Sequence, residues 1–417
     1  MSDYLDSLET RDPQQREAEL MARLPGLIAK AQSVPGWARL LQGVDAAQIN
    51  HRSALAQLPV THKSDLVRLQ QQAQPFGGLN VTPSHAMRRL FMSPGPIFDP
   101  QGQGEDWWRF ARPLHALGLR AGHVIQNCFS YHFTPAAFMM EEAARKLGCA
   151  VIPAGSGQTE QQVQAIAALR PDAWVGPPSF LRIIVERARE LGADISSIKM
   201  ALCSAEALPP RLRRWFYEQG ITRVMQTYGT ADIGNIAYET AVGDEVNEGM
   251  VLDEDLILEI VQPGGSQPVA EGEVGEVVIT SFNPDYPMIR FGTGDLSRVL
   301  PGPSACGRSN VRIAGWLGRA DQATKVRGMF IHPLQVQEIM RRHPQVQRAR
   351  MVVSGAMSND RMVLHCEVAE APPSADLTAT LISAMRDITK LRGEVQFCTP
   401  GSLPDDGRLI EDVRSYD

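Results

Sequence analysis

Two short polar segments hold the side chains best suited to chemistry. The first, Tyr286-Pro-Met-Ile-Arg-Phe-Gly-Thr-Gly-Asp295, ends with a carboxylate at a Gly-Thr-Gly bend. Glycine makes such a bend sterically cheap, and a fixed carboxylate suits the hydroxyls of a ribose. The second, residues 318–328, places four charged side chains between two glycines, a dense set of phosphate or ribose contacts. A solvated charged turn explains either segment alone, but their order and spacing together favour a nucleotide-handling hinge.

These segments resemble core motifs of the adenylate-forming enzymes, in the phenylacetate-CoA ligase branch. That branch carries Tyr-Pro-x-x-Arg-x-x-Thr-Gly-Asp and then Gly-Arg-x-Asp-x-x-x-Lys-x-Arg-Gly. The likeness covers most of the chain and includes Leu58–Leu66, Ser204–Glu206, Tyr228–Asp232 and Gly401–Pro404. It implies activation of a carboxylic acid by ATP, with an aromatic, phenylacetate-like acid expected, and transfer of the acyl group from the adenylate to coenzyme A.

The hydrophobic pattern predicts an α/β fold. From Trp107 onward, strands of about five residues alternate with helices of 10 to 12, which indicates stacked βαβ units and a largely parallel sheet. After Asp232, β-rich stretches at 256–261 and 276–280 predict hairpins of a smaller sheet or barrel. The expected elements between these points are helices at 106–117, 136–147, 160–169 and 180–191 and strands at 124–129, 150–153, 173–176 and 200–203.

A domain boundary is expected between Gly315 and Asp321. Residues 1–318 would form the AMP-binding domain, and residues 319–417 a small α+β lid with helices at 333–343 and 377–389 and strands at 349–354, 362–368 and 394–397. The resemblance implies that this lid rotates about Asp321 between an adenylation pose and a thioester-forming pose. Hinge motion that assembles two sites in turn is a general device of enzymes.

The resemblance assigns the nucleotide contacts residue by residue. Asp295 would bind the ribose hydroxyls, Arg319 the ribose and phosphate, and Tyr228, followed by Gly229, would stack on adenine. Glu206 lies in a segment that borders adenine. Two alternatives stay open: Tyr228 as a buried core residue at a strand end, and Glu206 as a helix N-terminal carboxylate before Pro209-Pro210.

The metal expected is Mg²⁺ alone. Asp232 stands where the family has a glutamate that helps to hold Mg²⁺, and a carboxylate oxygen suits this hard cation. Some relatives have a Cys/His cluster that could bind zinc, whereas this chain has Thr240, Ser304 and Cys306 there. One thiol does not make a four-coordinate site, so no zinc is expected.

Two places depart from the family pattern. The phosphate loop, Ser/Thr/Gly-rich in many relatives, reads Met92-Ser-Pro-Gly-Pro-Ile-Phe-Asp-Pro100 here. Its prolines remove backbone donors, Ser93 and Gly95 are the phosphate contacts left, and Asp99 would repel phosphate. We therefore expect weaker phosphate binding, or a loop that lines an acyl pocket through Ile97 and Phe98.

The second departure is Arg408, which replaces the lysine that neutralises the acyl carboxylate and α-phosphate in the family. Arginine is a planar fork and lysine a compact ammonium, so this exchange is not conservative. It is expected to slow adenylation while sparing thioester formation. The catalytic roles implied by the resemblance thus fall on Arg408, Asp232 and Asp321.

The remaining contacts concern the acid and coenzyme A. Phe129, Tyr131 and His132 follow a predicted strand end, where α/β proteins concentrate ligand sites, and would form an aromatic acyl pocket. A core histidine is the alternative for His132. Coenzyme A would meet three residues of the second polar segment, with a solvated basic turn as the alternative: Lys325, Arg327 and Gly328.

Composition limits the partners. With 41 basic and 47 acidic side chains the net charge is −6, which argues against nucleic acid. No apolar run approaches the 18 or so residues of a membrane span, and the start lacks the basic and apolar regions of a signal peptide. Six scattered cysteines suit a reducing cytoplasm. The resemblance suggests a homodimer acting on a small-molecule carboxylic acid.

Three functions remain open. The first is an AMP-forming acyl- or aryl-CoA ligase that uses ATP, Mg²⁺ and coenzyme A. The second is a relative impaired in adenylation that binds nucleotide or acyl-CoA, which the altered phosphate loop and Arg408 both motivate. The third is an adenylate-forming enzyme with another acceptor, such as the synthetases that join a nucleotide to a deazaflavin.

Overall fold

The computed structural model describes residues 3–93, 96–320, 322, 324–327, 329–355, 360–368, 375–404 and 408–414. The chain divides into two compact units, Met1–Gly318 and Arg319–Asp417. The two-residue strand β18 (Gly318–Arg319) lies at the boundary between them. Within the described residues, no helix has the length and apolar character needed to cross a membrane.

The main sheet of the first unit has nine strands in the order β16-β17-β12-β9-β8-β7-β6-β4-β5. Its strands β5, β4, β6, β7 and β8 run parallel, and beyond β8 the strands β9, β12, β17 and β16 are each antiparallel to the strand before them. The largely parallel sheet predicted from the alternation of strands and helices is confirmed. The strands are β4 (Val124–Asn127), β5 (Ala150–Pro153), β6 (Ala173–Gly176), β7 (Met200–Cys203), β8 (Arg223–Thr230), β9 (Gly234–Tyr238), β12 (Met250–Leu252), β16 (Val299–Leu300) and β17 (Arg312–Ile313).

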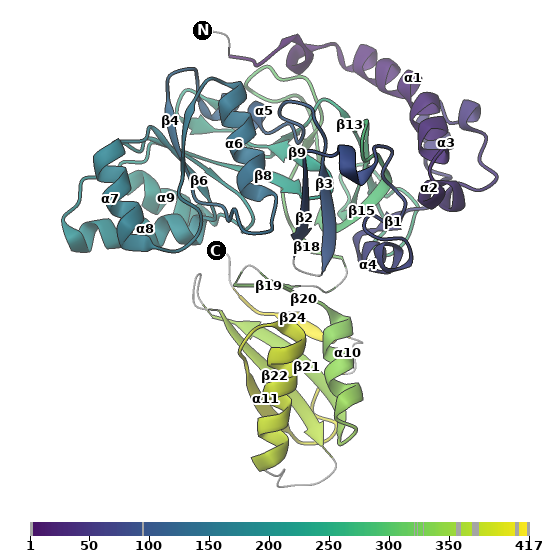
Figure 1. Ribbon diagram of the computed structural model, residues 1–417, viewed down its shortest axis with the longest axis vertical. Helices are drawn as coiled ribbons and strands as arrows, with labels where there is room; N and C mark the ends of the chain where they lie inside the picture. Colours follow the sequence, from purple (N-terminus) through teal and green to yellow (C-terminus); the bar gives the residue numbers. More distant parts are fainter. Residues whose placement is uncertain are drawn as a thin grey trace. The chain divides into compact units, whose positions relative to one another are not determined.

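Helices connect the parallel strands, as a parallel sheet requires. Four of these helices end at or just before a glycine with the left-handed conformation that stops a helix: Gly118, Gly148, Gly192 and Gly220. In Figure 1, α7, α8 and α9 gather on one side of the first unit near β6. The connecting helices are α5 (Ala111–Leu117), α6 (Ala136–Lys146), α7 (Thr159–Leu169), α8 (Pro178–Leu191) and α9 (Pro210–Glu218).

The helix expected at 106–117 starts five residues late. Asp106 (φ 46°) and Arg109 (φ 66°) both have left-handed backbones, which an α-helix excludes. The Asp106 carboxylate instead accepts from the backbone N–H of Ala111, at 3.1 Å to each oxygen. Trp107 and Trp108, expected on this helix, lie in the preceding turn and are buried in the core, so their helical placement was wrong.

A second sheet of the first unit contains strands in the order β1-β15-β14-β13. The antiparallel part, β13 to β15, is buried along almost its whole length and confirms the smaller β-rich region. A separate hairpin, β2 with β3, forms a regular antiparallel ladder from Arg89 opposite Gln101 to Ser93 opposite Ile97. The strands are β1 (Thr61–His62), β2 (Arg89–Ser93), β3 (Ile97–Gln101), β10 (Ala241–Val242), β11 (Glu245–Val246), β13 (Leu256–Val261), β14 (Gly275–Ser281) and β15 (Met288–Ser297).

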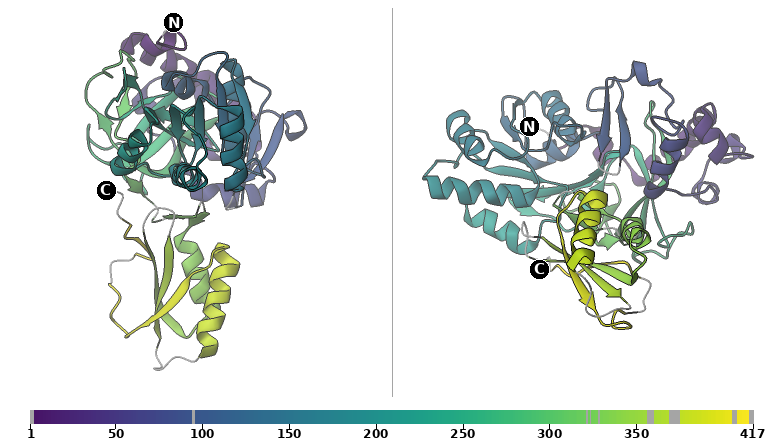
Figure 2. Two further views of the ribbon diagram at one scale, coloured as in Figure 1. Left: turned by 90° about the vertical axis from the view of Figure 1, so that its left-hand side faces the viewer. Right: turned by 60° about the horizontal axis from the view of Figure 1, so that its bottom comes forward.

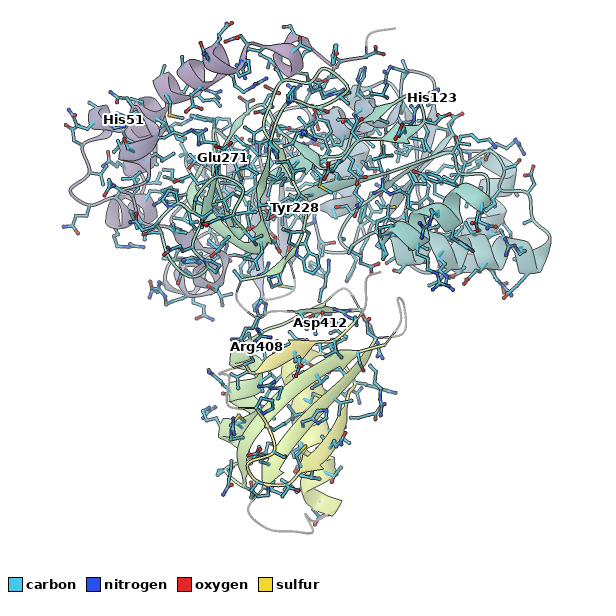
Figure 3. The ribbon with its side chains drawn as sticks, turned by 180° about the vertical axis from the view of Figure 1, so that it is seen from behind. His51, His123, Tyr228, Glu271, Arg408 and Asp412 are labelled. Carbon is cyan, nitrogen blue, oxygen red and sulfur yellow. The ribbon has the colours of Figure 1, made fainter. Side chains whose placement is uncertain are left out.

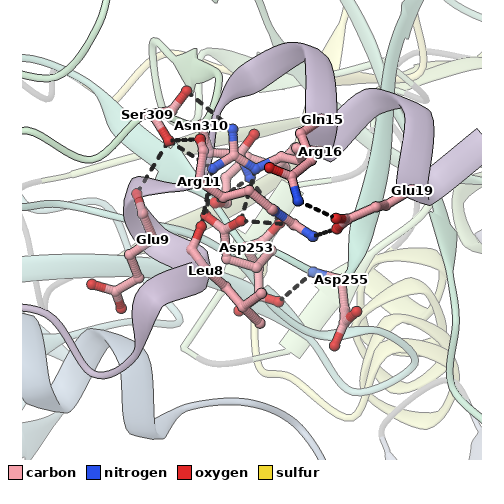
Figure 4. Close-up of polar contacts among 12 residues, drawn as sticks. Leu8, Glu9, Arg11, Gln15, Arg16, Glu19, Asp253, Asp255, Ser309 and Asn310 are labelled. Carbon is pink, nitrogen blue, oxygen red and sulfur yellow. Dashed lines mark hydrogen bonds and ion pairs between the residues drawn. The ribbon is translucent and has the colours of Figure 1, made fainter.

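The N-terminal region is helical. Its α-helices are α1 (Pro13–Gln32), α2 (Pro35–Leu40), α3 (Arg52–Leu55) and α4 (Lys63–Gln72), with short 3₁₀ turns at Ser7–Thr10, Ala46–Gln48 and Ser84–Ala86. The start of α1 is tied to distant parts of the first unit by buried charges (Figure 4). Arg16 donates to Glu254 Oε2 at 2.8 Å and to Ser309 Oγ at 2.8 Å. Burial raises the pKa of Glu254, and Arg16 opposes this rise.

The second unit is a small α+β body with its own apolar core. Its sheet has the order β23-β22-β21-β24, with β21 and β22 antiparallel and the outer pairings parallel. Helices α10 and α11 lie side by side on this sheet (Figure 2). The elements are β19 (Thr324–Val326), β20 (Met329–Ile331), α10 (Pro333–Arg342), β21 (Val346–Ser354), β22 (Arg361–Val368), α11 (Ala375–Thr389), β23 (Glu394–Cys398) and β24 (Ile410–Asp412).

Candidate nucleotide site

Asp295 lies on β15 and is bound by aromatic donors on both carboxylate oxygens. The hydroxyl of Tyr228, from β8, donates to Oδ2 at 2.9 Å, and the indole N–H of Trp316 donates to Oδ1 at 3.1 Å. The Tyr228 hydroxyl also contacts Thr293 Oγ1 at 3.2 Å. Two of the predicted nucleotide contacts, Tyr228 and Asp295, are therefore in direct contact. Figure 3 shows Tyr228 in the middle of the first unit.

Arg290 anchors β15 to the rest of the first unit. Its side chain is fully buried and makes a bidentate pair with Glu259, with both N···O distances at 2.9 Å. It also donates to the backbone carbonyls of Ala56, Leu58 and Ser266. Arg290 has φ 44°, an uncommon backbone state for a residue with a side chain, so the surrounding bonds must hold it. The motif arginine is thus structural in the described fold, and it fixes the strand that carries Asp295.

The carboxylate of Asp232 follows β8 and is fully buried as a side chain. Its Oδ2 pairs with Lys63 Nζ at 2.7 Å, a residue from the first turn of α4. Its Oδ1 has no hydrogen-bond partner among the residues that the structure describes. A lysine and an aspartate 169 positions apart therefore meet in this site.

Asp99 lies inside the first unit beside this pair. The alternation along β3 turns it inward, and the side chain is fully buried. Its Oδ2 accepts from the Ser93 hydroxyl at 2.6 Å. Burial raises the pKa of Asp99 to about 7, and the charge on Asp232 adds to this rise. Asp99 is therefore not the exposed, phosphate-repelling charge that the sequence suggested, and the Ser93 hydroxyl is engaged within the hairpin.

Gly229 and Glu206 have local structural roles. A Cβ at Gly229 would lie 2.6 Å from the carbonyl oxygen of Gly234 and 2.9 Å from Phe110, so the approach of β8 to β9 requires glycine there. Glu206 Oε2 accepts from the backbone N–H of Ser179 at 3.3 Å, at the start of α8. It is a helix N-terminal carboxylate, as one alternative held, but the helix is α8 and not the one that follows Pro209.

The three aromatic residues proposed for the acyl pocket do not share one environment. Phe129 is buried in the core, and the Tyr131 hydroxyl donates to Glu141 Oε2 at 2.8 Å. Burial raises the pKa of Tyr131, and the Glu141 carboxylate adds to it. His132 is exposed, with its ring edge-on to Phe133 at 4.6 Å between centroids, so the core-histidine alternative was wrong.

In the second unit, two segments far apart in sequence meet. The Leu409 N–H donates to Gln322 Oε1 at 3.0 Å, and Arg414 Nη2 donates to Thr324 Oγ1 at 3.0 Å. Arg408 and Lys325 thus lie on segments that are joined within this unit, and Arg408 and Asp412 are found at one end of it (Figure 3). Arg327 donates to Asp360 through its backbone N–H and its guanidinium, and Arg319 lies in β18. Gly95, Asp321 and Gly328 lie outside the described residues.

The comparisons with known proteins address the family. Residues 107–283 match the family model described as AMP-binding enzyme. The phenylacetate-coenzyme A ligase of Escherichia coli is 31% identical over 352 residues, which cover 80% of this chain and 78% of that protein. This chain belongs to the phenylacetate-coenzyme A ligase family. The Thermus thermophilus member is 29% identical over 381 residues, which cover 88% of this chain and 84% of that protein.

Solved structures support the fold. A 2-hydroxyisobutyryl-CoA ligase, in complex with 2-HIB-AMP and CoA, superposes with a TM-score of 0.87 at 22% identity and covers 100% of this chain and 93% of its own. An amide bond synthetase from Marinactinospora thermotolerans superposes with a TM-score of 0.57 at 16% identity, covering 94% and 92%. The chain therefore has the fold of adenylate-forming ligases.

Sequence reasoning missed two residues of this ligase-family site. Lys63 lies in the segment Leu58–Leu66, which carried part of the resemblance, and it is one of only six lysines against 35 arginines. That scarcity was the available signal. Trp316 stands between Gly315 and Gly318, just before the predicted hinge, and its contact with Asp295 had no sequence signal.

The residues expected at the zinc position of some relatives are brought together by hydrogen bonds. Thr240 Oγ1 lies 3.2 Å from Ser304 Oγ, which lies 3.1 Å from Cys306 Sγ. Arg308 donates to the same sulfur at 3.4 Å. Burial alone would raise the pKa of Cys306, but these donors outweigh it and lower the pKa below its usual range.

Proposed function

We propose that this chain is an ATP-dependent ligase that activates a carboxylic acid as an acyl-adenylate and transfers it to coenzyme A. The observation that carries the proposal is the 2.9 Å bond between the Tyr228 hydroxyl and Asp295, because it joins the two motifs assigned to adenine and ribose. Family membership supports the same activity. An aromatic acid is the preferred substrate class, since similar family members are phenylacetate-coenzyme A ligases.

The roles proposed for the first unit come from the family resemblance, and its geometry supports them. Asp295 binds the ribose hydroxyls, and Tyr228 packs on adenine. The buried Oδ1 of Asp232 suits Mg²⁺, because a hard cation takes carboxylate oxygens and Mg²⁺ is often held by one or two carboxylates together with substrate phosphates. When bound, this ion would neutralise charge on the ATP phosphates. Lys63 holds the other oxygen of Asp232 and adds a second positive charge there.

The roles proposed for the second unit are those of a mobile lid. Arg319 would contact ribose and phosphate, and Arg408 would neutralise charge as the adenylate forms. Lys325 and Arg327 would meet coenzyme A, while Asp321 would serve as the pivot. A homodimer in the cytoplasm remains part of this proposal.

One observation favours a second candidate, a family member impaired in adenylation. The segment at the place of the phosphate loop is the β2–β3 hairpin, in which the Ser93 hydroxyl binds Asp99 at 2.6 Å. A hydroxyl held by a buried carboxyl is a weaker donor for phosphate. Together with Arg408 in place of lysine, this arrangement would permit nucleotide or acyl-CoA binding with little turnover.

Pyrophosphate release tests both candidates. Purified wild type, Arg408→Lys and Asp295→Ala are assayed with ATP, Mg²⁺ and a panel of aromatic and aliphatic acids, with and without coenzyme A. The ligase proposal expects acid-dependent release in the wild type and a loss of about 10²-fold or more in Asp295→Ala. A silent wild type with an active Arg408→Lys would reject the competent ligase and support the impaired relative. Acid-dependent release together with formation of a product other than the CoA thioester would indicate another acceptor.

A further inference from the structure

Trp316 differs from the other tryptophans of the first unit. It is 40% exposed, whereas Trp37, Trp107, Trp108 and Trp174 are at most 7% exposed and Trp215 is half-buried. The Trp316 ring is thus accessible to a ligand while its polar atom is engaged. Here the engaged atom is the indole N–H, and its acceptor is the Asp295 carboxylate.

The backbone around Trp316 is fixed. The Ala314 N–H donates to the carbonyl of Arg298 at 3.0 Å, and the Leu317 N–H donates to the carbonyl of Leu296 at 2.9 Å. Ser297 Oγ donates to the carbonyl of Gly315 at 2.6 Å. The segment that carries the indole is therefore bound on both sides to the end of β15, the strand that carries Asp295. The Trp316 donor and the Asp295 acceptor are therefore both fixed to β15.

This arrangement matters for the orientation of the carboxylate. A carboxylate attached to one strand can turn about its χ2 torsion, which is a broad and soft torsion. Tyr228 at Oδ2 and Trp316 at Oδ1 fix both oxygens and so remove that freedom. Preorganised groups bind better because the ligand does not have to order them. A ribose diol needs two acceptors in a fixed arrangement, which the clamped carboxylate provides.

From this geometry we infer that Trp316 is a positioning residue for Asp295, holding its carboxylate for the ribose hydroxyls and covering the sugar with its exposed ring. The inference rests on the proposed function, because it assumes that Asp295 binds ribose. Trp316 is thus an additional residue of the nucleotide site, and its contribution to binding depends on the hydroxyls of the ligand. It also predicts that a bound nucleotide changes the environment of one surface tryptophan.

The test compares AMP with 2′,3′-dideoxy-AMP by calorimetric titration of the full chain. Trp316→Phe keeps the ring and removes the N–H donor. We expect it to weaken AMP binding about 5- to 10-fold, in line with the net loss of one hydrogen bond, and to weaken dideoxy-AMP binding less than about 2-fold. Trp215→Phe is the matched control: Trp215 is half-buried on α9 beside Arg182, and both affinities should stay within about 2-fold.

Intrinsic fluorescence gives an independent readout. AMP should change the tryptophan emission of the wild type and of Trp215→Phe, and most of that change should be lost in Trp316→Phe. Equal losses for AMP and dideoxy-AMP in Trp316→Phe would overturn the positioning role, as would unchanged AMP binding. If the wild type itself fails to bind AMP at millimolar concentration, the proposed function fails and the inference falls with it. Circular dichroism of each variant checks that the fold is retained.

Discussion

Replacing Arg290 with methionine should destabilise the first unit strongly. The arginine is fully buried and supplies two bonds to Glu259 and three to backbone carbonyls. Methionine fills much of the volume but supplies no donor, so the 8%-exposed Glu259 side chain keeps a charge without its partner. Removing one member of a buried pair costs about 3–5 kcal/mol, and each carbonyl that loses its donor adds about 1 kcal/mol when no water replaces it.

We expect Arg290→Met to lower the free energy of unfolding by about 6–8 kcal/mol, the sum of the broken pair and the three carbonyls. Domains are commonly stable by only about 5–15 kcal/mol, so this change approaches the whole margin. Urea unfolding followed by tryptophan emission is a suitable measurement, because all six tryptophans lie between Trp37 and Trp316 and report the first unit alone.

Two further variants make the result interpretable. Glu259→Gln combined with Arg290→Met should recover part of the loss, since the uncompensated charge is removed. Glu186→Gln is the matched control, because Glu186 forms a half-exposed pair with Arg182 on α8 and should cost less than about 0.5 kcal/mol. A cost below about 1 kcal/mol for Arg290→Met would refute the view that this arginine anchors β15.

Three other predictions concern the buried charges and the strand contact near the site. The raised pKa of Asp99 means that the folded state holds a proton that the unfolded chain releases near its ordinary pKa of 3.8; stability should therefore fall as the pH rises from about 4 to about 7. At pH 8, Asp99→Asn should therefore have a free energy of unfolding on the order of 1–3 kcal/mol above that of the wild type, as measured by urea titration. This difference should vanish near pH 4, and a constant difference between pH 4 and pH 8 would contradict the raised pKa of Asp99. Lys63→Met should destabilise by about 2–3 kcal/mol, because it leaves the buried Asp232 carboxylate without this partner, and a cost below about 0.5 kcal/mol in the same urea titrations would argue against the pair with Asp232. Gly229→Ala should lower the melting temperature measured by circular dichroism, by an amount that corresponds to a loss of at least about 2 kcal/mol in stability, because the new Cβ would lie 2.6 Å from a backbone atom. Gly243→Ala is the comparison: its Cβ would have no atom within 4 Å, so it measures only the cost of replacing a glycine with a left-handed backbone.

The fold could be predicted where a short apolar run is bounded by turn-forming residues. The strands at 150–153, 173–176, 200–203 and 256–261 have the expected bounds, since each is a short apolar run. The prediction failed at α5, where two left-handed residues delay the helix and no residue type announces them. Asp106 and Arg109 are ordinary helix-compatible side chains, and only the packing of Trp107 and Trp108 requires the turn.

The motifs of the site could be predicted from the sequence, but the contacts between its side chains could not. Tyr228 and Asp295 were each identified from local patterns, but their contact depends on how β8 and β15 of different sheets face each other. The Lys63 pair with Asp232 joins residues 169 positions apart, and no local pattern encodes it. Asp99 was misjudged because its place on the inner face of β3 is set by the hairpin register. Long-range register is a tertiary property that single-sequence reasoning does not reach.

The buried charges at the start of α1 constrain the order in which the chain can fold during synthesis. Arg16 donates to Ser309, which lies 293 positions later, so this contact cannot form until nearly the whole first unit has been made. At about 5–20 residues per second, that wait is roughly 15 to 60 s on the ribosome. Throughout it the first helix must stay solvated, away from the interior it will join. Arg16 is thus made early but completes its contacts late, and a chain stopped before residue 309 would lack the Ser309 contact of α1.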